Sequence, residues 1–277
     1  MSDSTDRSWS LRPRFHRRTK PGARPGALKV CPDAAPPRVR VIAYSRDDVM
    51  EVELSDPAKI RELMAEWPVV WVNVDGLGDA AMLRQFADAF QIHPLALEDV
   101  VNVHQRAKVE EYEEHLFCVV RSPHAKVCQL TEQLSLFIGK NYVLSFQEEQ
   151  GDCFDPVRIR LRKSDSNLRS EPRADYLGYR LIDSVIDGYF PVLEEIGNRL
   201  DDLDDRTINT SNDTAFAELH SVKRELLMYR RAVWPLRDLV NELRADTNDF
   251  ISDRTRLYLR DSLDHAVQVI EVLETYR

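Results

Sequence analysis

Residues 181–205 read LIDSVIDGYFPVLEEIGNRLDDLDD, and apolar side chains recur in this stretch at intervals of four and three residues. The repeat comprises Ile182, Ile186, Tyr189, Leu193, Ile196, Leu200 and Leu203. This spacing predicts one apolar stripe along a long helix, as in a coiled-coil seam. A second stripe follows, made of Leu219, Val222, Leu226, Tyr229, Val233, Leu236, Val240 and Leu243. Thr207–Asp213 between them is rich in Asn, Ser and Thr, so we expect an antiparallel helical hairpin.

A third long helix is expected from Asp253 to Arg277. Its apolar face consists of Leu259, Leu263, Val267 and Ile270. The pattern runs to the last residue without a Gly, Asn or Pro terminator, so we expect the helix to continue in a longer parent protein. Pro235 lies inside the second stripe, where it removes one helical hydrogen bond and is expected to kink the helix.

The preceding part of the chain mixes strand and helix patterns, as is typical of an α/β or α+β domain. Strands are expected at residues 39–44, 69–74, 107–121, 131–138 and 142–148. Helices are expected at residues 56–66, 79–90 and 95–100. Gly139-Lys140-Asn141 is expected to be the turn of a hairpin. We assign residues 39–170 to this mixed domain and residues 171–277 to a long-helix, coiled-coil-like domain.

Charge is unevenly distributed along the chain. Residues 1–40 contain ten Lys or Arg, three Asp and six of the 14 prolines, whereas the whole chain carries a net charge of −9. We expect residues 1–38 to form a disordered basic tail, and a solvated extension is favoured over attraction to anionic lipid or nucleic acid. The acidic remainder is unsuited to nucleic acid, because phosphate contacts need positive surface, and it is suited to hard divalent cations.

Membrane and export signals are absent from the sequence as given. The longest apolar runs fall well short of the ~18 residues that a spanning helix needs, and no secretory pattern follows the N-terminus. The four cysteines have no C-x-x-C spacing, which disfavours a structural zinc site or a disulfide framework. We therefore expect this portion to be soluble, with free thiols in a reducing cytoplasm.

Two motifs have a functional and a structural interpretation. Residues 76–81 fit G-x-G-x-x-A between an expected strand and an expected helix, with Glu98 about 20 residues further on, as in a dinucleotide site. Asp75 and Asp79 would repel a pyrophosphate, so a tight turn with Asp79 as the helix N-cap is favoured.

The acidic run at residues 110–115 is expected to be a solvated face of a strand. No catalytic signature is recognisable, so the chain is not expected to be an enzyme.

Carboxylates recur in groups at positions expected to be helical. The groups are Glu98 with Asp99, Asp183 with Asp187, Asp261 with Asp264 beside His265, and Asp201, Asp202, Asp204 and Asp205. Like charges four residues apart destabilise an isolated helix by about 0.2–0.5 kcal/mol, so we expect a compensating cation. Spacing alone leaves its identity open between bound metal, basic groups of a partner, and arginines of the second long helix. These arginines are Arg224, Arg230 and Arg231.

A series of short motifs adds a more specific signal. They are HPLALEDV (93–100), NVHQRAK (102–108), QE (147–148), FDPVR (154–158), ADYL (174–177), LID (181–183), WPLR (234–237), DSLDH (261–265) and ETYR (274–277). In this order and spacing they resemble the cytoplasmic domain of the CorA family of magnesium channels, over about residues 39–277.

The resemblance implies an α+β fold: an N-terminal αβα sandwich, a long antiparallel helical hairpin, and a C-terminal helix truncated before the membrane. It also implies a homopentamer that binds regulatory divalent cations between neighbouring domains, Mg²⁺ above all and also Co²⁺ or Ni²⁺. In one such site Asp99 faces Asp261 of the next subunit. In a second site Glu98 lies near Asp183, with Asp187 as a further candidate.

The family's two transmembrane helices and its Gly-Met-Asn pore signature are absent from this sequence. We therefore expect a Mg²⁺-sensing regulatory domain, cytoplasmic in a full-length protein of the inner membrane and joined to the membrane only through helices beyond Arg277. One alternative is the corresponding domain of a related zinc transporter, for which imidazole ligands such as His265 or His104 would be suited. Another is a helical scaffold or nucleotide-binding module without a metal.

Overall fold

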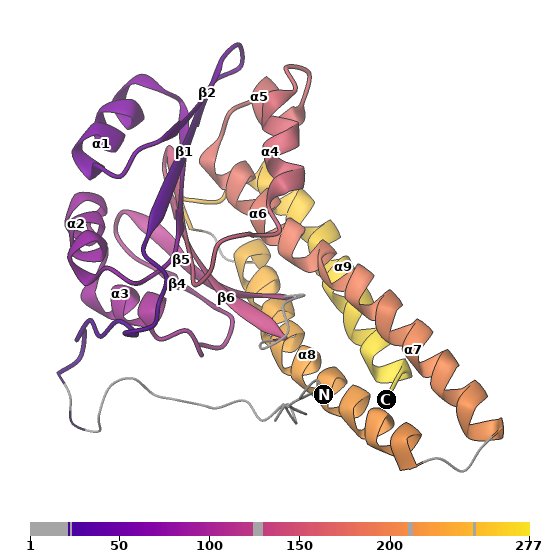
Figure 1. The fold of residues 1–277 in the computed structure, drawn as a ribbon. Helices are drawn as coiled ribbons and strands as arrows, with labels where there is room; N and C mark the ends of the chain where they lie inside the picture. The colour runs from indigo at the N-terminus through magenta and orange to yellow at the C-terminus, as the bar shows by residue number, and fades with distance from the viewer. Residues whose placement is uncertain (1–21, 23, 124–129, 210–212, 246–247) are drawn as a thin grey trace, which may run out of the picture.

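The computed structural model describes residues 22, 24–123, 130–209, 213–245 and 248–277. A seven-stranded mixed sheet runs through the N-terminal half, in the order β2-β1-β3-β7-β6-β5-β4 (Figure 1). The strands are β1 (Arg38–Tyr44), β2 (Val49–Glu53), β3 (Val69–Asp75), β4 (Lys108–Glu111), β5 (His115–Pro123), β6 (Thr131–Gly139) and β7 (Tyr142–Gln147). Only β3 and β7 pair in parallel among these strands, and the other neighbours are antiparallel.

The strands follow the predicted pattern with two differences. The hairpin between β6 and β7 turns at residues 140 and 141, as expected. The single strand expected at 107–121 is wrong, because the chain turns between Glu111 and His115 and forms the antiparallel pair β4 and β5. The edge strand β2 was not predicted, since its residues are half-buried or exposed and its apolar run is short.

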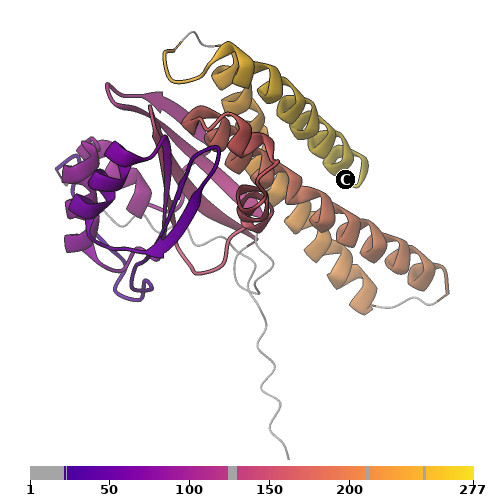
Figure 2. The same cartoon turned by 90° about the horizontal axis from the view of Figure 1, so that it is seen from above.

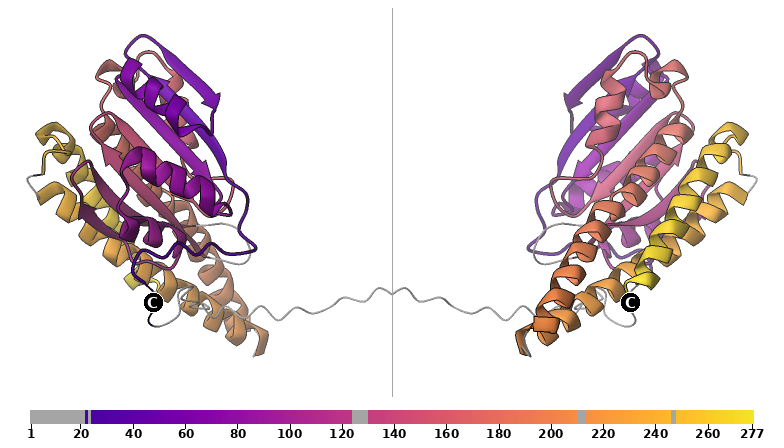
Figure 3. Two further views of the ribbon diagram at one scale, coloured as in Figure 1. Left: turned by 90° about the vertical axis from the view of Figure 1, so that its left-hand side faces the viewer. Right: turned by 90° about the vertical axis from the view of Figure 1, so that its right-hand side faces the viewer.

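Helices cover both faces of the sheet, which gives the expected αβα sandwich (Figure 3). One layer consists of α1 (Pro57–Glu66), α2 (Ala80–Phe90) and α3 (Pro94–Val101), and its core contains Phe86, Phe90, Phe117 and Phe137. The opposite layer contains α4 (Asp155–Arg162), α5 (Asn167–Ser170) and α6 (Ala174–Asp187). Its core continues without a break from the sheet into the long helices.

The long helices form the expected hairpin and C-terminal helix. The hairpin end of α7 (Tyr189–Asn209) and α8 (Asp213–Ala245) extends away from the sheet, whereas α8 also contacts β4 and β5. α9 (Asp253–Thr275) lies beside α6 and α8 (Figure 2). Gly188 separates α6 from α7, so the first stripe is carried by two helices rather than one. Part of the expected hairpin loop lies outside the described residues. Among the described residues, no helix is long and apolar enough to cross a bilayer.

Residues 24–37, which we term the N-terminal strap, lie against the α1–α3 layer. Leu28 and Val30 pack on its core, and Ala35 accepts a hydrogen bond from the Gly78 amide at 2.8 Å. Gly76 has a φ of +99°, and a Cβ there would lie 2.6 Å from the Pro36 carbonyl oxygen. The G-x-G motif therefore accommodates the chain's own backbone. Of the predicted tail at residues 1–38, positions 1–21 and 23 lie outside the described residues.

Candidate metal site

One buried carboxylate fixes where α6 and α9 meet. Asp175, in the first turn of α6, accepts hydrogen bonds from the Ser252 amide at 3.0 Å, the Ser252 hydroxyl at 2.7 Å and the Thr255 hydroxyl at 2.8 Å. Ser252 is itself the N-cap of α9. Burial alone would raise the pKa of Asp175, but hydrogen bonds from Ser252, Arg173 and Thr255 hold it below its usual value. The two helices are thus tied together at their N-terminal ends.

Further along the two helices, Asp183, Asp187 and His265 come together. One ligand atom from each of the three lies within 4.8 Å of the other two. Asp183 and Asp187 share a face of α6 because they are four residues apart, and His265 reaches them from α9. The His265 Nδ1 lies 3.3 Å from Asp187 Oδ1, and its Nε2 lies 4.0 Å from Asp261 Oδ2. Two of the five predicted metal ligands, Asp183 and Asp187, belong to this cluster, which we term the α6/α9 site, and a third, Asp261, lies beside it.

Asp183 is the buried member of the α6/α9 site, with its side chain 5% exposed. The Ser262 hydroxyl donates to its Oδ1 at 2.6 Å, and the Arg180 guanidinium donates to its Oδ2 at 2.8 Å. Burial and the charge of Asp183 raise the pKa of Asp187, and His265 offsets only part of this effect. The charged form of Asp187 is therefore disfavoured by burial and by Asp183, and a bound cation would offset this cost.

The other two predicted ligands lie on the opposite side of the sheet. Glu98 and Asp99 belong to α3, whose core is separate from that of α6 and α9. Glu98 accepts a hydrogen bond from the Gly26 amide of the N-terminal strap at 2.7 Å. Asp99 accepts from Lys108 Nζ at 2.6 Å and from Gln105 Nε2 at 2.8 Å. Within one chain, the five predicted acids thus form two groups.

The acidic run at residues 110–115 contributes to the α3 group. Glu110 shares Lys108 with Asp99, at 2.6 Å, and also accepts from the Tyr112 hydroxyl at 3.0 Å. His104, named for the zinc alternative, is exposed on the same side and does not join the α6/α9 site.

Two residues that complete the α6/α9 site were not predicted. Arg180 lies three residues before Asp183, so helical spacing was a signal for it. Ser262 is fully buried on the apolar stripe of α9, and a hydroxyl at a core position is a signal that a polar partner faces it.

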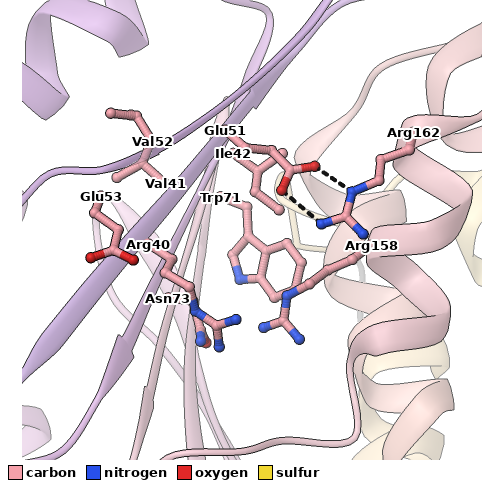
Figure 4. A pocket seen from close by; sticks show the side chains of 10 residues that line it. All are labelled: Arg40, Val41, Ile42, Glu51, Val52, Glu53, Trp71, Asn73, Arg158 and Arg162. Atoms are coloured by element: carbon pink, nitrogen blue, oxygen red, sulfur yellow. Dashed lines mark hydrogen bonds and ion pairs between the residues drawn. The ribbon is translucent and has the colours of Figure 1, made fainter.

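A pocket of about 220 Å³ beside β1 and the edge strand β2 bears on the nucleotide alternative (Figure 4). Three arginines line it, and the Arg158 guanidinium lies 5.0 Å from the centre of the Trp71 ring. The arginine–carboxylate pairs are Arg40 with Asp75, Arg158 with Asp152, and Arg162 with Glu51. Since each guanidinium already has a carboxylate partner, the pocket offers no surplus positive charge to a phosphate.

Comparisons with known proteins identify a matching family and similar sequences. The profile of the family described as CorA-like Mg²⁺ transporter protein matches residues 68–277. The cobalt/magnesium transport protein CorA of Thermotoga maritima is 36% identical over 242 residues, which are 86% of this chain and 69% of that protein. The putative metal ion transporter YfjQ of Bacillus subtilis is 29% identical over 213 residues, which are 76% of this chain and 65% of that protein.

Solved structures share the fold. The soluble domain of CorA from Methanocaldococcus jannaschii superposes with a TM-score of 0.74 at 15% identity, over 86% of this chain and 92% of that chain. The ZntB cytoplasmic domain from Vibrio parahaemolyticus superposes with a TM-score of 0.68 at 10% identity, over 86% of this chain and 91% of that chain. The family profile covers most of the residues, and the T. maritima relative is more than 30% identical over most of its length. The chain therefore belongs to the CorA-like Mg²⁺ transporter family.

Proposed function

We propose that this chain is the divalent-cation-sensing part of a CorA-type transporter, with Mg²⁺ as its regulatory ligand and Co²⁺ or Ni²⁺ as further ligands. Membership of a transporter family implies a role other than catalysis. The observation that carries the proposal is the α6/α9 site, where two carboxylates and an imidazole converge from two helices.

The donors of the α6/α9 site suit a divalent cation. Carboxylate oxygens are preferred by Mg²⁺, and an imidazole adds affinity for Co²⁺, Ni²⁺ and Zn²⁺. Asp183 and Asp187 would hold the ion with His265, and each ligand side chain is already oriented by a neighbour on α6 or α9. The His265 ring is the specific feature that keeps Zn²⁺ as a second candidate ligand.

Neighbouring copies of the chain would bring the two acid groups together. Asp261 is 71% exposed on α9, so a second copy has access to it. In a homopentamer, Asp99 of one copy would face Asp261 of the next and share a hydrated cation with it, and Glu98 would lie near Asp183. Without that cation, the facing carboxylates repel each other, and this repulsion would loosen the pentamer. In this proposal the domain lies on the cytoplasmic side, and α9 carries the change toward the membrane.

A ligand-dependent stability measurement tests the proposal. At about ten times its dissociation constant, a bound ion stabilises the folded state by about 1.4 kcal/mol, which raises Tm by a few degrees. We expect this rise with MgCl₂ over NaCl of equal ionic strength, and we expect its loss in the triple variant Asp99→Asn/Asp187→Asn/Asp261→Asn. The control Asp201→Asn/Asp202→Asn changes exposed acids of α7 and should keep the rise. An equal response of the triple variant and the wild type would refute the site.

A further inference from the structure

Arg180 places a permanent positive charge inside the α6/α9 site. Its Nη1 donates to Asp183 Oδ2 at 2.8 Å, and the two side chains are only 14% and 5% exposed. A guanidinium stays protonated at any pH at which the protein is folded, so this charge cannot be switched off by proton loss. Any cation that approaches Asp183 therefore meets a positive charge that is already bound there.

The Tyr179 side chain holds the Arg180 guanidinium in place without supplying a second negative charge. The guanidinium carbon lies 5.5 Å from the centre of the Tyr179 ring, and Nη1 also contacts the Tyr179 hydroxyl at 3.3 Å. The buried Nε makes no hydrogen bond to any of the residues that the structure describes. Asp183 is thus the carboxylate that Arg180 binds. Because Nε makes no hydrogen bond, Arg180 gives up fewer hydrogen bonds when a cation displaces it from Asp183.

The hydrogen bonds to Asp183 leave little of its carboxylate for a metal. Ser262 donates to Oδ1 and Arg180 donates to Oδ2, so each oxygen already has one donor. A hydroxyl can turn and tolerate a nearby ion, whereas a guanidinium repels it. A cation that binds through Oδ2 must therefore displace Arg180 or bind against its charge.

We propose that Arg180 is an internal competitor of the divalent cation, which occupies Asp183 in the metal-free state and thereby weakens metal binding at the α6/α9 site. This inference rests on the proposed function and concerns the regulation of that same site. It assigns Arg180 a role in setting the cation concentration at which the site fills.

A purely structural ion pair makes a different prediction. If Arg180 only stabilises the fold, removing it lowers the stability of the metal-free protein and leaves the metal affinity unchanged or weaker. If Arg180 competes with the ion, removing it lowers the stability of the metal-free protein and strengthens metal binding. The sign of the change in affinity separates the two roles.

Isothermal titration of the full 277-residue chain with Mg²⁺, and separately with Mn²⁺ as a tighter-binding probe, measures this sign. We expect Arg180→Met to bind at least tenfold more tightly than the wild type, because a unit charge about 4 Å from a divalent ion weakens binding by more than this even in a water-like dielectric. Arg180→Gln, which keeps a donor for Asp183 without the charge, should behave in the same way and serves if the methionine variant fails to fold. Arg180→Lys should stay near the wild type.

The matched control is Arg199→Met, which removes an arginine from its pair with Glu225 between α7 and α8, about three helical turns beyond Asp187. It should leave the affinity unchanged. An unchanged or weakened affinity of Arg180→Gln, with metal binding intact in the wild type, would overturn the competitor role and leave the proposed function standing. Absence of binding to the wild type and to both neutral variants would overturn the proposed function, and the competitor role with it.

Discussion

The two acid groups of this domain lie on opposite sides of one sheet and are held in different ways. On α3, Glu98 is held by a backbone amide of the N-terminal strap and Asp99 by the flexible side chain of Lys108. On α6 and α9, Asp183 is held by a largely buried arginine and a fully buried serine. The half-exposed acids of α3 depend on the N-terminal strap, which is distant in sequence. The acids of the α6/α9 site depend on the packing of two long helices. Changes in stability and affinity should therefore differ between the two sides.

The largest effect is expected where α6 and α9 are tied together. Asp175→Asn should lower the free energy of unfolding by about 3 kcal/mol, because three donors around a buried carboxylate lose a charged acceptor. Chemical denaturation of the variant and the wild type measures this loss. The Mg²⁺-dependent rise in Tm should also shrink, since the α6/α9 site depends on the alignment of the two helices.

The pH dependence of the same variant gives a second readout. The folded-state pKa of Asp175 lies below its unfolded value, so its contribution is present above the unfolded pKa and is lost as the pH falls through the folded pKa. The stability difference between the wild type and Asp175→Asn should therefore narrow as the solution is acidified. A difference that stays constant down to acid unfolding would mean that the carboxylate charge is not what ties the helices.

An intermediate effect is expected on the α3 side, where the N-terminal strap crosses the G-x-G motif. Gly76→Ala should cost about 2 kcal/mol, because alanine is strained at a positive φ and its Cβ would collide with the strap backbone. Gly151→Ala is the matched control, since Gly151 has a φ of +96° but no atom within 4 Å of its added Cβ. The difference between the two variants isolates the strap contact.

Trypsin provides the local readout for this comparison, because Lys29 lies in the strap. Cleavage after Lys29 should be faster in Gly76→Ala than in Gly151→Ala, because a displaced strap is exposed to protease. Equal cleavage rates would indicate that the strap does not depend on the glycine, and Glu98 would then have to be held independently of it.

The sequence indicated the helical side of the molecule better than the strap side. Apolar spacing predicted α7, α8 and α9 because most residues of their stripes face a continuous core, although Leu219 and Val267 are exposed. The same spacing could not detect the break at Gly188, since the stripe passes across it in register. Neither β2 nor the strap has a periodic apolar pattern. Both are determined by tertiary contacts, which local sequence patterns do not encode.

The α6/α9 site shows the same limit. The spacing of Asp183 and Asp187 predicted a shared helix face, and His265 was expected to be a ligand only for the zinc alternative. The meeting of these two helices required the tertiary structure. Arg180 was detectable from its spacing to Asp183, but its burial was not, and burial is what makes its charge matter at the site.

The smallest effect is expected from Lys108, the counterpart of Arg180 on the α3 side. Burial alone would lower the pKa of Lys108, but hydrogen bonds to Asp99 and Glu110 raise it above its ordinary value, so the lysine is charged. Its side chain is 29% exposed, against 14% for Arg180, and solvent screens a charge that is accessible to water. Lys108→Met should therefore change Mg²⁺ affinity only about twofold, equivalent to about 0.5 kcal/mol.

Titration calorimetry of Lys108→Met beside Arg180→Met tests whether burial sets the size of the competition. Lys140→Met, at an exposed position in the turn between β6 and β7, controls for the change in net charge. If Lys108→Met strengthened binding as much as Arg180→Met, burial would not decide how strongly a basic residue competes with the ion. The two sides of the sheet would then be equivalent in their electrostatics, and their difference would be limited to the way each is held in the fold.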